Sequence, residues 1–244
     1  MNFKMLLSYD GSRYRGWQRL ADSEMTIQGK LEAVLSRMAG NKIEVIGSGR
    51  TDACAHALGQ VANFHCCTDL SCKEIKAYLQ QYLPEDIGVI SVEQVDARFH
   101  SRYLAHRKTY RYRVWNSEFP CVFERKYVYQ DNTVLNVEIM NEAAQRFVGK
   151  HDFLAFCSNK HFKKSSVRTI FDFSVVREGD EVIFTVSGDG FLYNMVRIMV
   201  GTLLSIGRGE RKPEDIQAIF DSNTRESAGE TVPAKGLCLM EVVY

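Results

Sequence analysis

The order in which strand-like and helical segments follow one another most constrains the fold of this 244-residue chain. Over residues 1–101 the order is strand, helix, strand, strand, helix, strand, which is that of the ferredoxin-like split unit. The same order recurs over residues 102–244, and no long Gly/Ser linker separates the two copies. We therefore predict an α+β protein with two ferredoxin-like (βαββαβ) halves that lie side by side and share one sheet.

The segments themselves are read from hydrophobic periodicity and from residues that start and stop helices. In the first half we expect strands at 3–9, 43–46, 58–64 and 87–95, and helices that begin after Thr26 and Ser71 and end at Gly40 and Pro84. In the second half we expect strands at 108–115, 169–177, 182–187 and 237–243, and helices at 137–148, 192–206 and 213–221.

A glycine-bracketed turn, Gly-Ser-Gly-Arg-Thr-Asp at residues 47–52, joins two strands of the first half. Arg50 and Asp52 are two residues apart, so an extended backbone would point both side chains the same way. A neighbouring guanidinium keeps a carboxylate ionised and limits its rotation, which suits a nucleophile or a general base. An aspartate that only caps its turn and pairs with Arg50 would give the same pattern, so the spacing alone leaves both roles open.

Tyr110 lies in a strand that alternates aromatic and basic residues, Tyr110-Arg111-Tyr112-Arg113. Successive side chains of a strand point to opposite faces, so the tyrosines share one face and the arginines the other. Such a strand can stack an extruded base while it holds phosphates, although two core tyrosines would look the same.

Arg197 interrupts the apolar helix expected at 192–206. A guanidinium on such a helix must find a partner or extend to water. We hypothesise that it reaches the Asp52 carboxylate from the other half of the molecule.

Charge is unevenly distributed, although the net charge is only +1. The stretch from Arg98 to Arg113 contains six basic residues and no acidic one, and the stretch from Lys160 to Arg168 also lacks Asp and Glu. This polarisation favours a basic cleft for nucleic acid on a near-neutral protein, with a solvated basic face as the alternative.

The remaining composition is that of a globular cytoplasmic protein, with 45% hydrophobic and 25% charged residues. No apolar run is long enough to span a bilayer, and the N-terminal residues lack the apolar region of a signal peptide. The seven cysteines are odd in number and form no CxxC pair, which favours reduced thiols. The Cys and His residues also lack the spacing of zinc ligands, so we expect no metal.

Seven segments, in one order, carry a likeness to a known family. They are YDGSRYRGWQ (9–18), TIQGKLEAVL (26–35), GRTDACAHALGQVANF (49–64), FHSRYLAHRKTYRY (99–112), GKHDFLAF (149–156), FLYNMVRIMVG (191–201) and PAKGLCLMEVVY (233–244). Together they span nearly the whole chain and resemble the TruA family of tRNA pseudouridine synthases, whose GRTDAGVHA signature carries its catalytic aspartate at the position of Asp52.

The resemblance implies the pseudouridine synthase fold, with a mixed, mainly antiparallel sheet, helices on one side and a central basic cleft. It implies an isomerase that converts uridine to pseudouridine at positions 38, 39 and 40 of the anticodon stem-loop of tRNA. It further implies that the enzyme needs no cofactor and no metal and acts as a homodimer.

The resemblance also implies roles for individual residues. Asp52 would be the catalytic nucleophile, Arg50 would displace the target base, Tyr110 would stack on the uracil, and Arg197 would pair with Asp52. Further tRNA contacts are expected at Tyr103 and at residues that are basic or carry an imidazole: Arg13, Arg15, His56, His100, Arg102, Lys108, Lys163, Lys164 and Arg168.

Two departures from the family pattern are visible. Cys54-Ala55 replaces the usual Gly-Val, so Cys54 must take the backbone angle of a glycine. Tyr193 and Asn194 replace two histidines. Two other functions remain open on the residues alone: a non-catalytic RNA-binding protein of ferredoxin-like fold, and a metal-free hydrolase that uses Asp52.

Overall fold

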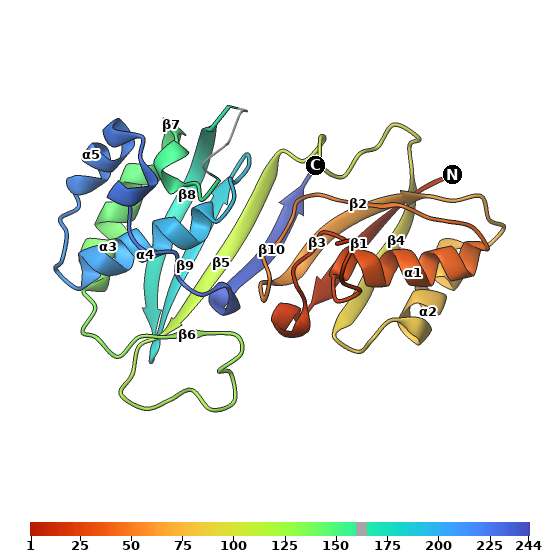
Figure 1. The fold of residues 1–244 in the computed structure, drawn as a ribbon, viewed down its shortest axis with the longest axis horizontal. Helices are drawn as coiled ribbons and strands as arrows, with labels where there is room; N and C mark the ends of the chain where they lie inside the picture. Colours follow the sequence, from red (N-terminus) through yellow and green to blue (C-terminus); the bar gives the residue numbers. More distant parts are fainter. Residues whose placement is uncertain (160–164) are drawn as a thin grey trace. The chain divides into compact units, whose positions relative to one another are not determined.

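Two units make up the chain in the computed structural model, which describes residues 1–159 and 165–244. The first unit is Met1–His106 together with Cys238–Tyr244, and the second is Arg107–Leu237 (Figure 1). The halves expected from the sequence, 1–101 and 102–244, divide the chain differently, because the last strand belongs to the first unit.

The first unit contains a mixed, mainly antiparallel sheet. Its strands are β1 (Asn2–Tyr9), β2 (Val45–Gly47), β3 (His56–His65), β4 (Ile87–Val95) and β10 (Leu237–Val243). β1 lies between β4 and β3 and is antiparallel to both. Along the other edge of β3, β2 pairs antiparallel at one end and β10 pairs parallel at the other.

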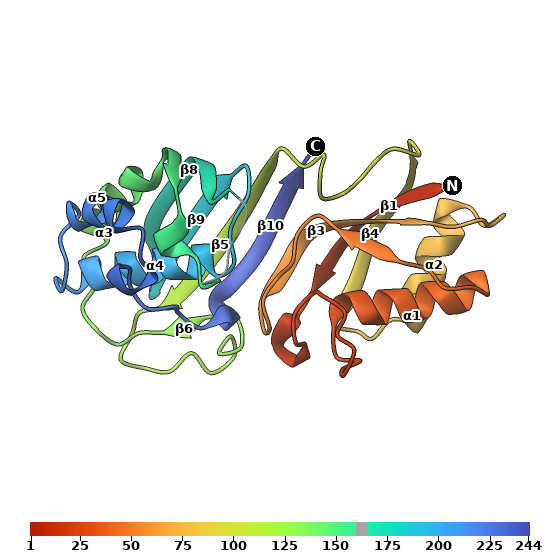
Figure 2. The ribbon, with the colours of Figure 1, turned by 45° about the horizontal axis from the view of Figure 1, so that its top comes forward.

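Two helices, α1 (Ile27–Ala39) and α2 (Cys72–Tyr82), lie side by side on one face of this sheet (Figures 1 and 2). The Thr26 hydroxyl accepts the Gly29 N–H at the start of α1, and Gly40 ends the helix with a left-handed φ of 67°. At the start of α2, Ser71 and Glu74 form a capping box. Both helices predicted in this half are therefore confirmed.

In the second unit most strands pair antiparallel. Its strands are β5 (Arg107–Trp115), β6 (Tyr129–Gln130), β7 (Gly149–Asp152), β8 (Val167–Glu178) and β9 (Glu181–Gly188). The order β5-β9-β8-β7 is antiparallel throughout, and β6 is a short parallel addition to β5. β6 and β7, which the sequence pattern did not predict, have only two and four residues.

The helices of the second unit are α3 (Val137–Ala144), α4 (Met195–Gly207) and α5 (Asp215–Ser222). Short 3-10 turns complete the chain: Gly11–Arg13, Gln145–Phe147, Leu154–Phe156, Arg225–Ser227 and Ala234–Gly236. α4 begins three residues later than expected because Asn194 adopts a left-handed φ of 63°. The α+β class and the mainly antiparallel pairing are confirmed. No helix in the described ranges is both long and apolar enough to cross a membrane.

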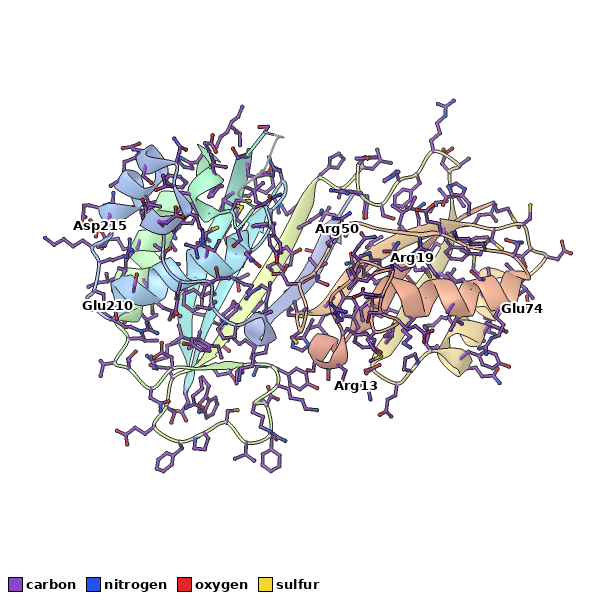
Figure 3. The ribbon with its side chains drawn as sticks, viewed as in Figure 1. Arg13, Arg19, Arg50, Glu74, Glu210 and Asp215 are labelled. Atoms are coloured by element: carbon purple, nitrogen blue, oxygen red, sulfur yellow. The ribbon has the colours of Figure 1, made fainter. Side chains whose placement is uncertain are left out.

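Glu32, on α1, is a buried carboxylate that ties the helix to β2. Its oxygens accept hydrogen bonds from the Val45 N–H (3.1 Å), the Gln28 amide (3.0 Å) and Arg19 (2.8 Å; Figure 3). Hydrogen bonds to a buried charged group contribute more than those between neutral groups. Since β2 leads directly into the turn at 47–52, this contact anchors that turn.

Replacing Glu32 by alanine leaves two buried donors without an acceptor, so we expect a loss of about 2–3 kcal/mol of unfolding free energy. Urea denaturation measures this loss. The matched control is Glu44→Ala, because Glu44 is exposed; it should change stability by less than about 0.5 kcal/mol. Equal effects of the two substitutions would contradict the anchoring role.

Candidate active site

The side chain of Gln60, on β3, holds the turn that carries Asp52 against the sheet. The Gln60 amide donates to the Gly49 carbonyl (3.2 Å) and accepts from the Ser48 hydroxyl (2.6 Å), and both side chains are fully buried. The Thr51 hydroxyl bonds to the Tyr9 hydroxyl (2.8 Å) on β1. The residues that precede Asp52 are therefore held by the sheet itself.

The loop at residues 10–17 covers the other side of the same turn. The Trp17 N–H donates to the Thr51 carbonyl (3.1 Å), and the Cys54 N–H donates to the Tyr14 carbonyl (3.2 Å). A Cβ on Gly11 would lie 1.9 Å from the Ala55 carbonyl oxygen, so only glycine fits there. A Cβ on Gly16, whose φ is +95°, would lie 2.7 Å from the Thr51 carbonyl oxygen. These close approaches explain both glycines of the YDGSRYRGWQ segment.

Asp52 itself is half-buried at the top of this turn, and its carbonyl accepts the Ala55 N–H (3.1 Å). Arg50 is exposed and, within the described ranges, forms no ion pair, so its guanidinium is open to a ligand (Figure 3). The turn thus presents a half-buried carboxylate and an exposed guanidinium from one segment that the sheet holds in place.

Cys54 has the left-handed backbone that the family pattern requires of it, with a φ of 65°. Its thiol is exposed and lies 3.7 Å from the Ser12 carbonyl oxygen. Cysteine thus stands in a glycine-like conformation at the family's glycine position, and the backbone of Cys54 bears the strain.

His56 is buried and fastens β3 to the 10–17 loop. Its Nδ1 accepts the Gly11 N–H (3.0 Å) and lies 3.2 Å from Asp10 Oδ1. Only one of these two contacts can be a hydrogen bond in a given protonation state. Nδ1 must be unprotonated to accept from Gly11 and protonated to donate to Asp10. The direction of the backbone N–H is fixed, so we assign Nδ1 as the acceptor, and His56 has a structural role here.

The other residues expected to contact tRNA differ in their exposure and in whether their side chains already have partners within the protein. Arg13 makes a two-pronged contact with Asp86 (3.0 and 2.6 Å), and Arg15 lies 3.3 Å from Asp22. Arg168 donates to the carbonyls of Ser165 and Val167. Arg102 is exposed, whereas His100 and Lys108 are half-buried. Lys163 and Lys164 lie outside the described residues.

In the second unit, Tyr110 lies on β5 opposite Val186 and is 7% exposed. Its ring meets that of Phe191 edge-on, with centroids 5.1 Å apart. Tyr112, two residues further on, is fully buried and donates its hydroxyl to the Pro233 carbonyl (2.6 Å). Burial also raises the pKa of Tyr112 far above its ordinary value. Its complete burial makes Tyr112 a packing residue.

Arg197 projects from the first turn of α4, which is otherwise almost completely buried. Its Nε donates to the Val232 carbonyl (2.7 Å) and its Nη1 to the Asn194 side-chain oxygen (2.8 Å). The Asn194 amide in turn donates to the Ser158 hydroxyl (3.0 Å). Asn194 therefore orients the guanidinium, a role that sequence reasoning missed. Asp52 belongs to the first unit and Arg197 to the second, and their pairing stays a prediction.

A carboxylate on a turn that is held by close backbone contacts at Gly11 and Gly16 fits an enzyme that works through an aspartate. In the described part of the chain no group of three His, Cys, Asp or Glu residues could hold a metal.

Comparison with known proteins defines the class further. A family model described as tRNA pseudouridine synthase matches residues 5–104 and 143–244. The chain is 51% identical over 243 residues to tRNA pseudouridine synthase A of Bacillus sp. strain KSM-64, covering 100% of this chain and 99% of the relative. It is 47% identical to tRNA pseudouridine synthase A 2 of a Bacillus cereus strain, and 46% identical to the protein of that name from Clostridium perfringens strain 13, with the same coverage. The chain belongs to the tRNA pseudouridine synthase family.

The left-handed backbone of Cys54 leads to a stability prediction. Glycine takes a positive φ without strain, whereas alanine keeps the strain of cysteine, so Cys54→Gly should be more stable than Cys54→Ala by about 0.5–1 kcal/mol. Thermal and urea unfolding of the two variants measure the difference. A Gly variant that is less stable than the Ala variant would mean that Cys54 has an ordinary backbone.

Proposed function

We propose that this protein isomerises uridine to pseudouridine in tRNA, at positions 38, 39 and 40 of the anticodon stem-loop. The observation that carries the proposal is Asp52. It occupies the aspartate position of the family signature, on a turn whose backbone is held by β3 on one side and by the 10–17 loop on the other. Its side chain is half-buried rather than enclosed, so a substrate can reach it.

The reaction breaks the N-glycosidic bond of uridine, rotates the uracil and rejoins it to the ribose through carbon 5. The uracil is both leaving group and incoming group, so atoms and electrons balance without a cofactor or a metal. Asp52 starts the reaction, by attack on the sugar or the base or by removal of the ribose 2′ proton. A held carboxylate is suited to each of these steps because it loses little freedom on reaching the transition state.

Three other residues support this step. The free guanidinium of Arg50 helps to displace the target base and fills the gap that the base leaves. Tyr110 stacks on the extruded uracil from β5, and Arg197 pairs with Asp52. Extruding a base costs a few kcal/mol, which contacts between basic side chains and phosphates offset.

We also propose that the protein acts in the cytoplasm as a homodimer, with one tRNA spanning both subunits. The family resemblance supports this assembly. Sedimentation of the purified protein tests it, since a stable species near the 27.9 kDa of one chain would contradict it.

The principal competing function is a non-catalytic RNA-binding protein, and Asp52→Asn separates the two. The variant keeps the shape of the side chain but lacks the nucleophile, so an enzyme should still bind unmodified tRNA and lose at least about 10³-fold in product formation. Chemical mapping of pseudouridine measures product, and filter binding measures affinity. Wild-type protein that binds tRNA but forms no pseudouridine would favour the binding protein. Release of free uracil would favour the hydrolase.

The contacts of Arg197 lead to a second prediction. Arg197→Ala should nearly abolish turnover. Asn194→Gly tolerates the left-handed backbone but removes one anchor of the guanidinium, so kcat should fall by about tenfold, the equivalent of one hydrogen bond to a charged group. Multiple-turnover kinetics at saturating tRNA give kcat, and filter binding gives the tRNA affinity separately.

Asn194→Asp is the matched control, because it keeps both an acceptor for Arg197 and tolerance of a positive φ. Its kcat should stay near that of the wild type. Wild-type turnover of Asn194→Gly, or equal losses in the Gly and Asp variants, would exclude a positioning role for the Asn194 side chain.

A further inference from the structure

The segment that follows β4, residues 96–106, is an irregular turn whose backbone is tied firmly to the first unit (Figure 1). The Asn2 amide donates to the carbonyls of Asp96 (3.0 Å) and Phe99 (2.9 Å). Asn63 Oδ1 accepts both the N–H (2.9 Å) and the hydroxyl (2.6 Å) of Ser101, and the Tyr244 hydroxyl donates to the Ser101 carbonyl (2.7 Å). Asn2, Asn63 and Ser101 are all buried, so this turn is preorganised.

Two aromatic side chains stack on this turn. The rings of His100 and Tyr103 have centroids 4.1 Å apart and an interplanar angle of 29°. His100 Nδ1 accepts the backbone N–H groups of Arg102 (3.2 Å) and Tyr103 (3.3 Å), which orients the imidazole against the tyrosine ring. We call this stacked pair of His100 and Tyr103 the aromatic ledge. Within it the imidazole lies against the backbone of the turn, and the Tyr103 ring lies on the outer side.

The outer face of this ledge is open. Tyr103 is 77% exposed although His100 covers one face of its ring, so the opposite face must be in contact with solvent. An aromatic ring prefers offset stacking on another flat π-system, and the open face of Tyr103 leaves room for one. The ring is therefore available for stacking without a change in the fold.

The charges around the ledge favour a nucleic acid as that partner. Arg98 and Arg102 flank it in the chain and are exposed, and neither side chain is paired with another residue that the structure describes. The sequence from Arg98 to Arg113 contains no acidic residue. Unpaired arginines beside an open aromatic ring are what a single-stranded stretch of RNA requires, the arginines for its phosphates and the ring for its bases.

We propose that the open face of Tyr103 stacks on an unpaired base of the tRNA, while Arg98 and Arg102 contact neighbouring phosphates. The proposal rests on the proposed function only in taking tRNA as the substrate. Stacking accepts any base, because every base has a π-face. Tyr103 therefore adds to the affinity for tRNA and helps to position the RNA strand. It does not distinguish one base from another.

The test compares the affinity of full-length variants for unmodified tRNA at several salt concentrations. Tyr103→Leu keeps an apolar side chain but loses the ring, so its Kd should rise by roughly 5- to 50-fold with an unchanged salt dependence. Tyr103→Phe is the matched control and should bind like the wild type. Arg102→Ala should instead lower the slope of log K against log salt by about 1, since it removes a phosphate contact.

His100→Asn tests the imidazole of the ledge. Asparagine keeps a side-chain acceptor for the N–H groups of the turn but has no ring, so binding should weaken while thermal unfolding stays the same. Wild-type affinity of Tyr103→Leu would overturn the proposal. So would a change in sedimentation of Tyr103→Leu, because it would mean that the ledge contacts another protein chain. Pseudouridine formation, measured separately, decides the proposed function whatever the outcome for Tyr103.

Discussion

The contact between the 10–17 loop and the Asp52 turn is the constraint on which the candidate site depends. Two backbone segments approach so closely at Gly11 and Gly16 that no side chain fits between them. The hydrogen bonds from Trp17 and Cys54 then close the contact. A carboxylate on a free loop would lose conformational freedom at each turnover, whereas this turn has lost that freedom on folding. The site is therefore positioned by backbone packing, and its side chains need only be of the right chemical type.

Local signals explain why much of the fold could be predicted from the sequence. Thr26 and Ser71 are N-caps whose side chains bond the first turn of each helix, and such bonds depend on neighbours within three residues. The late start of α4 has the opposite origin. No glycine or proline marks its first three expected residues as non-helical, but the Asn194 side chain bonds to Ser158 and Arg197 instead of capping the helix. One of these partners is distant in the chain, so no local pattern could reveal it.

The candidate site shows the same limit. Asp52 and Arg50 could be found because a family motif surrounds them, and Tyr112 could be set aside as a packing residue because the family resemblance assigns the base contact to Tyr110. The ion pair between Arg13 and Asp86 could not be predicted, since the two residues are 73 positions apart in the chain. This pair occupies the guanidinium that was expected to contact tRNA. His56 was equally ambiguous, because its acceptor role depends on the Gly11 N–H across the loop. Sequence thus identifies which residues can act, and long-range pairing decides which remain available.

The two departures from the family pattern share one backbone property. Cys54 and Asn194 both have a positive φ, a conformation that is costly for cysteine and much less so for asparagine. At Asn194 the conformation directs the amide toward Arg197, so the substituted residue supplies a hydrogen bond of its own. At Cys54 the conformation is that of a turn residue, and the exposed thiol lies 3.7 Å from the Ser12 carbonyl oxygen. Of the two substituted side chains, only that of Asn194 therefore acts on another site residue.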